Sequence, residues 1–181
     1  HAARLPSSIR LKWNGAKSDQ LEHLPTLYVL AVGVSTYQDA NLKLAFAAQD
    51  ARDFTRIINA QKGLAYGKII VKTLTDKDAS LGNVRQGLKW IQSKVGEDDV
   101  AMVFIAGHGV DDPSGTYHFL PHNAEVSKLQ ATALPYTDIR RALAAIKGLT
   151  YFFIDTCHSG DALGRPGRAS TDTTRMINDL S

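Results

Sequence analysis

A regular alternation of apolar runs and amphipathic stretches is the feature that most constrains the fold. Four runs of strand-like composition cover residues 27–34, 67–76, 99–107 and 150–156. Three stretches with apolar residues at helical spacing lie between them, at 45–63, 80–95 and 135–148. Strand and helix in this order favour right-handed crossovers and parallel strands, covered by helices on both faces. We therefore predict an α/β fold with a mainly parallel central sheet.

The remaining segments divide the chain around one main domain. The 181 residues and the 44% hydrophobic content suit a single domain with its own core. Residues 1–26 are polar and turn-rich, and we interpret them as a leader or edge segment with a short strand at 9–13. Within the main domain, 27–164, residues 116–122 alternate like one arm of a hairpin. Residues 165–181 have the composition of a loop or linker.

Composition excludes several classes of function. The net charge is +3 and no run of Lys or Arg exceeds two residues, so we expect neither nucleic acid nor a membrane surface as a partner. No apolar stretch approaches the roughly 20 residues that span a bilayer. A single cysteine excludes an internal disulfide and fits a reducing compartment, so we expect a cytoplasmic protein.

Two of the parallel strands end in residues that carry chemistry. His108 stands between two glycines after one strand, and Cys157, the only cysteine, follows another. Chemistry in such sheets gathers at the carboxyl ends of the strands. A free thiol has a pKa of about 8.5, and a neighbouring imidazole makes it a nucleophile by taking its proton. Backbone N–H groups near Gly109 and Cys157 would then form an oxyanion hole.

Other interpretations of the same residues are weaker. A lone cysteine is often a small buried hydrophobe, and a histidine between glycines can be a turn residue. A zinc site would draw on Cys157, His158, His108, His118 and His122. However, Cys157 and His158 are adjacent and no CxxC pair occurs, so we predict no metal. A cysteine phosphatase needs an arginine six positions after the thiol, and this chain has Leu163 there.

The motifs resemble those of the caspase-like cysteine peptidases, in particular the metacaspase and bacterial orthocaspase branch. The resemblance rests on "FIAGHG" with His108, "DTCHSG" with Cys157, and "LYVLAVGVSTY" followed by "LAFAAQDA". The histidine precedes the cysteine by about 50 residues, as in caspases, but Asp155 replaces the caspase glutamine. The resemblance implies a caspase-like three-layer sandwich, a catalytic domain at 27–164 and a His108/Cys157 dyad.

Two acids indicate the substrate. Asp155 lies two residues before Cys157, on the same side of a strand, and Asp50 lies early in the helix after the first strand. Two carboxylates beside a nucleophile favour a cationic side chain in the substrate. In metacaspases the matching residues are understood to bind the Arg or Lys before the cut bond. We therefore predict an endopeptidase that cleaves after Arg or Lys.

This chain also differs from the family pattern at several positions. Calcium-dependent metacaspases carry extra acids where this chain has Pro135, Tyr136, Thr137 and Gly164, so we expect no cofactor and activity without calcium. Ala106 stands where a serine often precedes the catalytic histidine.

A complete caspase-like domain continues past the cysteine into a processing loop and a small subunit. We therefore expect a small-subunit-like chain to complete the sheet, and self-cleavage at Arg165, Arg168 or Arg175. The main alternative is a catalytically silent caspase-like scaffold for protein–protein interaction, although both His108 and Cys157 are retained. A flavodoxin-like ligand binder is a further alternative, but no phosphate-cradling glycine loop follows the first strand.

Overall fold

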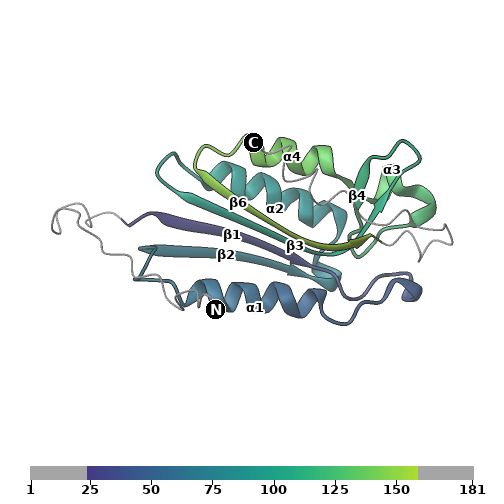
Figure 1. Ribbon diagram of the computed structural model, residues 1–181, viewed down its shortest axis with the longest axis horizontal. Helices are drawn as coiled ribbons and strands as arrows, with labels where there is room; N and C mark the ends of the chain where they lie inside the picture. Colours follow the sequence, from purple (N-terminus) through teal and green to yellow (C-terminus); the bar gives the residue numbers. More distant parts are fainter. Residues whose placement is uncertain (1–23, 159–181) are drawn as a thin grey trace, which may run out of the picture.

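The computed structural model describes residues 24–158, with the backbone alone at 157 and 158 (Figure 1). Its sheet has six strands in the order β2-β1-β3-β4-β5, and β6 pairs with β3 on a separate branch. Four of the strands are mutually parallel: β1 (Thr26–Gly33), β2 (Lys68–Thr75), β3 (Val100–Asp111) and β6 (Leu149–His158). These are the four strands predicted from the apolar runs.

Helices cover both faces of the sheet, so the chain forms a three-layer α/β sandwich. Helix α1 (Ala47–Asn59) lies on one face, and helices α2 (Leu81–Lys94) and α4 (Tyr136–Ala144) lie side by side on the other (Figure 1). This confirms the predicted fold class. The Ser80 hydroxyl caps the start of α2, because it accepts the N–H of Asn83.

The core is divided by the sheet. The larger cluster lies between the sheet and α2 and α4, and it includes Leu30, Ile91 and Ile139. On the other face, α1 packs through small residues at its start, and a Cβ at Gly33 would overlap the carbonyl of Ala47. This close approach sets the first turn of α1 against the carboxyl end of β1.

Smaller elements extend the sheet beyond β3. Strand β4 (Tyr117–Phe119) pairs antiparallel with the end of β3, which confirms the predicted hairpin. Strand β5 (Leu134–Pro135) pairs with β4, and helix α3 (Leu129–Thr132) precedes it. Neither element was predicted, because β5 has two residues and α3 has four, which is too few to show a periodic pattern. Three 3₁₀ turns complete the fold: η1 (Ala40–Leu42), η2 (Asp76–Asp78) and η3 (Val126–Lys128).

Several predicted boundaries were wrong. Strand β3 continues to Asp111 and β6 to His158, so His108 and Cys157 lie inside strands rather than in the turns after them. Pairing of β3 with β4, and of β3 with β6, keeps both strands extended at these positions. Helix α4 begins at Tyr136, directly after Pro135, one residue later than the predicted start of this stretch.

Other predictions fall outside the described residues. These include the leader with its strand at 9–13, and the linker at 165–181. Within residues 24–158, no helix is long and apolar enough to cross a bilayer.

Candidate active site

His108 and Cys157 are direct neighbours in the register of two parallel strands. Strands β3 and β6 pair from Val100↔Leu149 to Gly109↔His158, and His108↔Cys157 is one rung of this ladder. Neighbouring strands lie about 4.8 Å apart, so the two backbones are held within the reach of their side chains. The register therefore brings together residues from two distant parts of the chain.

The surroundings of His108 fix the tautomer of its imidazole. The residue is 8% exposed, and its Nε2 lies 3.0 Å from the carbonyl oxygen of Leu42. Because a carbonyl oxygen only accepts hydrogen bonds, Nε2 must carry the proton. Nδ1 is then the basic nitrogen of the neutral ring.

Burial lowers the pKa of His108 from its usual value, because the imidazolium loses hydration inside the protein. The Leu42 carbonyl opposes this in part, since it stabilises the charged ring. The net effect favours the neutral imidazole. A neutral imidazole is the form that can take a proton from a thiol.

Glycines on either side of His108 make room for its neighbours. Gly107 has a φ of 153°, and a Cβ there would lie 3.0 Å from the hydroxyl of Tyr37 and from the ring of Phe119. A Cβ at Gly109 would overlap the ring of Tyr117. The Gly-His-Gly sequence therefore serves close packing inside a strand. Gly109, predicted to help form an oxyanion hole, lies in β3 directly after His108.

A second contact holds β6 beside the site. The hydroxyl of Tyr117 hydrogen-bonds the hydroxyl of Thr156, the residue before Cys157. Tyr117 lies in β4, so this bond ties the hairpin after β3 to the end of β6. Sequence reasoning missed Tyr117, Tyr37 and Leu42. The position of Tyr37 shortly after the first strand could have indicated a residue near the site. No local pattern identifies a backbone carbonyl such as that of Leu42.

The predicted substrate acids lie toward the same end of the sheet. The Phe54 ring of α1 lies 5.4 Å from the Phe153 ring of β6. Asp50 is one turn before Phe54, about 6 Å along the helix, and Asp155 is two residues after Phe153, about 6.6 Å along the strand. Helix α1 and strand β6 run in opposite directions. The step back from Phe54 to Asp50 and the step forward from Phe153 to Asp155 therefore both lead toward the carboxyl ends of the parallel strands. Asp155 is exposed and Asp50 half-buried.

Asp155 also has a defined neighbour on β3. Its register partner is Ala106, which is 1% exposed. A serine at position 106 would bring a hydroxyl beside this acid, and alanine has none.

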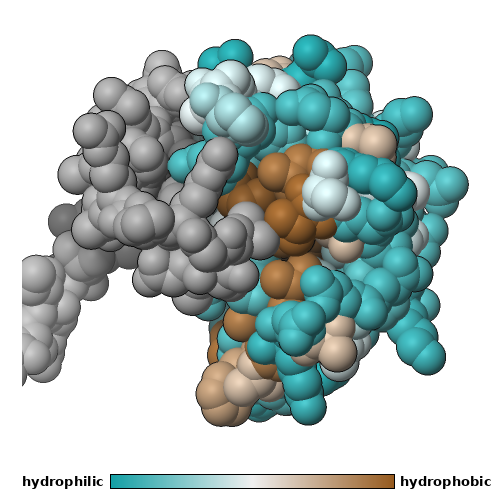
Figure 2. All heavy atoms as spheres, turned by 90° about the vertical axis from the view of Figure 1, so that its right-hand side faces the viewer, coloured by the Kyte–Doolittle hydropathy of each residue, from teal (hydrophilic) through white to brown (hydrophobic). Residues whose placement is uncertain are grey.

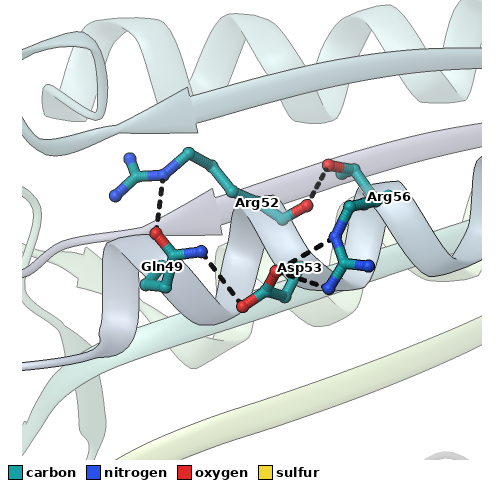
Figure 3. A network of polar contacts seen from close by, with 5 residues as sticks. Gln49, Arg52, Asp53 and Arg56 are labelled. Atoms are coloured by element: carbon teal, nitrogen blue, oxygen red, sulfur yellow. Dashed lines mark hydrogen bonds and ion pairs between the residues drawn. The ribbon is translucent and has the colours of Figure 1, made fainter.

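The other charged residues of α1 have polar contacts of their own, and Figure 3 shows those of Arg52, Asp53 and Arg56. Asp53 accepts hydrogen bonds from Gln49 at 3.0 Å and Arg56 at 2.9 Å, and Arg52 donates to Gln49. These bonds hold the pKa of Asp53 below its usual value. Asp50 takes no part in this network, which leaves Asp53 as a natural comparison for it.

Among the side chains of residues 24–156, no three from His, Asp or Glu form a group that could hold a metal ion. Two of the histidines named above as possible zinc ligands contact backbone carbonyls. His118 Nδ1 lies 2.9 Å from the carbonyl of Thr116, and His122 Nδ1 lies 2.6 Å from the carbonyl of Thr36.

Figure 2 looks onto the end of the molecule at which the parallel strands finish. Hydrophobic side chains gather in the middle of this face, with hydrophilic residues above them and to their right in the view.

Comparison with protein families shows that residues 26–179 match the model of the Caspase domain. The match covers most of the chain, so this protein belongs to the caspase-domain family, which is a family of cysteine peptidases. Comparison with curated proteins gives no significant match.

The fold is also similar to a crystal structure, that of protein GSU0716 from Geobacter sulfurreducens. The TM-score is 0.62, the sequence identity is 20%, and the similarity covers 86% of this chain. It covers 63% of the other chain. At this identity the likeness concerns the fold alone, and this chain spans less than two thirds of its counterpart.

Proposed function

We propose that this protein is a cysteine endopeptidase that cleaves polypeptides after Arg or Lys, with His108 and Cys157 as its catalytic dyad. The observation that carries the proposal is the register pair His108↔Cys157 at the carboxyl end of two parallel strands. Membership of the caspase-domain family supports it. The motif resemblance favours the metacaspase and orthocaspase branch.

In the proposed reaction His108 acts first as a base and Cys157 then acts as the nucleophile. Neutral His108 takes the proton of the Cys157 thiol at Nδ1, and the sulfur attacks the carbonyl carbon of the substrate. The N–H groups of Gly109 and Cys157 stabilise the oxyanion. The protonated imidazole then gives its proton to the leaving amine, which departs and leaves a thioester. Water, deprotonated by His108, hydrolyses the thioester and restores the thiol.

The Leu42 carbonyl supports this cycle in two ways. It holds the ring by its Nε2–H bond, so Nδ1 stays the reactive nitrogen. It also stabilises the imidazolium that forms after proton transfer, since an acceptor oxygen favours the charged ring.

Specificity for basic residues rests on Asp50 and Asp155. The contact between the Phe54 and Phe153 rings supports this role, because each acid lies beyond one of these rings toward the carboxyl ends of the strands. A guanidinium or ammonium group between two carboxylates gains charge-assisted hydrogen bonds, whereas an acidic side chain is repelled.

A partner strand is part of the proposal. Within residues 24–158, β6 pairs with β3 alone, so its other edge is open. Leu149, Tyr151 and Phe153 are 57%, 43% and 42% exposed. An open apolar edge strand is an association site. We propose that a small-subunit-like chain adds to it after self-cleavage at Arg165, Arg168 or Arg175, which lie outside the described residues. No cofactor, including calcium, is part of this scheme.

The deciding experiment first labels Cys157 with a covalent inhibitor and then measures the hydrolysis of peptide substrates. An arginyl chloromethyl ketone should alkylate Cys157 in the wild-type protein, and His108→Ala should suppress the labelling. His122→Ala is the matched control, because that histidine bonds the Thr36 carbonyl instead. Arginyl and lysyl peptide amides should be hydrolysed and aspartyl ones should not. Equal labelling of wild type and His108→Ala, without peptide hydrolysis, would favour the silent scaffold.

A further inference from the structure

The segment between β1 and α1 contacts His108 from two directions. Tyr37 is 7% exposed, and its hydroxyl oxygen accepts the backbone N–H of His108 at 2.9 Å. Its ring lies 5.3 Å from the imidazole, tilted by 39°. Five residues later, the Leu42 carbonyl accepts the imidazole Nε2–H. One short segment therefore fixes both the main chain and the ring of His108.

This segment is itself tied down at several points. The N–H of Leu44 donates to the carbonyl of Ser35 at 2.8 Å, which closes the loop on itself. The N–H of Gln38 donates to the carbonyl of His122 at 2.9 Å. Movement of the Tyr37 hydroxyl relative to Leu42 is restricted by these bonds, so the two contacts to His108 act as a unit.

Asp76, the first residue of η2 directly after β2, anchors the start of the segment. Its carboxylate accepts the N–H groups of Ser35 at 2.9 Å and Thr36 at 2.8 Å, and its own φ is 50°. A non-glycine residue in the left-handed region persists only where its surroundings hold it there. Burial, together with the charge of Asp76, raises the pKa of Tyr37, so its phenol stays neutral at all working pH values.

The backbone geometry at His108 explains why the hydroxyl of Tyr37 accepts the His108 N–H. The preceding residue, Gly107, has a φ of 153°. His108 N–H is directed to the Tyr37 hydroxyl, while its carbonyl accepts the N–H of Leu120. Without the hydroxyl this buried N–H would lack that acceptor, and a buried donor without a partner is costly. The main chain would then shift to find another partner and carry the imidazole with it.

We propose that Tyr37 is a positioning residue for His108, holding the imidazole at the place where it meets Cys157. The proposal deepens the proposed peptidase function and rests on it. Tyr37 does not touch the substrate or transfer a proton. It acts through the His108 main chain and through the packing of the two rings.

The test compares Tyr37→Phe with Tyr66→Phe in the full chain. Phenylalanine keeps the ring packing and removes only the acceptor oxygen. Tyr66 precedes β2 at the opposite end of the sheet, so the loss of its hydroxyl is a matched control. Because Cys157 is the only cysteine, alkylation by iodoacetamide reports on it alone. Three quantities are measured: kcat and KM for an arginyl peptide amide, the pH dependence of alkylation, and the thermal midpoint.

For Tyr37→Phe we expect kcat to fall about tenfold, as for the loss of one buried hydrogen bond, with KM changed less than twofold. The alkylation midpoint should rise by about half a pH unit or more, because a displaced imidazole stabilises the thiolate less. Tyr66→Phe should match the wild type in all three measurements.

The alkylation profile separates this inference from the proposed function. If the wild type cleaves no peptide but the Tyr37→Phe profile is shifted, the positioning role stands and the peptidase proposal fails. If the Tyr37→Phe and wild-type profiles superimpose, the inference is overturned, whatever happens to kcat or to the thermal midpoint. A loss of kcat that only follows the unfolded fraction is the signature of a structural role and also overturns it.

Discussion

His108 and Cys157 occupy one rung of the ladder between β3 and β6. The pairing needs no loop to fold back over the sheet, because the strands are parallel and their register sets it. Around this rung, the Leu42 carbonyl holds the imidazole and Tyr37 holds the main chain. Two strands of one sheet therefore carry His108 and Cys157, and the segment between β1 and α1 supplies the contacts to His108.

The pH dependence of activity should reflect the burial of His108. An unperturbed histidine has a pKa of about 6.5, and burial lowers the pKa here. We expect the acid limb of kcat/KM to have its midpoint below pH 6.5, since the neutral imidazole is the active form. The limb reports the coupled titration of His108 and Cys157. Peptide hydrolysis from pH 4 to 8 measures it, and a midpoint above 6.5 would contradict the expectation.

The same shift predicts a loss of stability in acid. The unfolded chain binds a proton at His108 more readily than the folded one, so this contribution to stability is complete above the unfolded pKa. It is lost as the pH falls through the lower folded pKa. Urea unfolding of Cys157→Ala at pH 7.5 and 5 measures the change. The double variant His108→Gln, Cys157→Ala should lose less stability over that range.

Removal of the substrate acids should weaken the preference for a basic residue. We expect Asp155→Asn and Asp50→Asn each to lower kcat/KM for an arginyl peptide amide by about tenfold or more, mainly through KM, since each removes a charge-assisted contact. Asp53→Asn is the control on the same helix, because Asp53 is already paired with Arg56. Comparison with a norleucyl substrate isolates the charge effect. Equal effects at Asp50 and Asp53 would exclude Asp50 from the pocket.

Two glycine substitutions should have opposite effects. Alanine at Gly109 would overlap the Tyr117 ring and should destabilise the protein by about 1–3 kcal/mol, as overpacking does. Alanine at Gly82, in helix α2, meets no atom within 4 Å. It should stabilise the protein by about 0.5–1 kcal/mol through helix propensity. Urea denaturation measures both, and a neutral Gly109→Ala would contradict the close packing.

The open edge of β6 should control association. Tyr151→Lys places a charge on an exposed apolar edge position and should reduce self-association of the chain, because edge charges oppose strand pairing. Thr73→Lys, at an exposed position of the opposite edge strand β2, is the control. Sedimentation velocity across a range of concentrations compares them. If both variants associate like the wild type, β6 is not the contact.

Periodicity and residue type determined much of this from the sequence. The apolar runs predicted all four parallel strands, and helical spacing predicted α1, α2 and α4. The motifs around His108 and Cys157 indicated the family, which the Caspase domain match confirms. These signals are local. A strand buried on both faces is a continuous apolar run, and a helix buried on one face has apolar residues at helical spacing.

The tertiary structure decided the rest. The extension of β3 and β6 through His108 and Cys157 depends on pairing with β4 and with each other, which no local pattern records. The Leu42 carbonyl has no sequence signature, since every residue carries one, and Tyr37 acquires its role only where the chain folds back onto His108. Sequence determines which groups are available, whereas register and packing determine which of them meet.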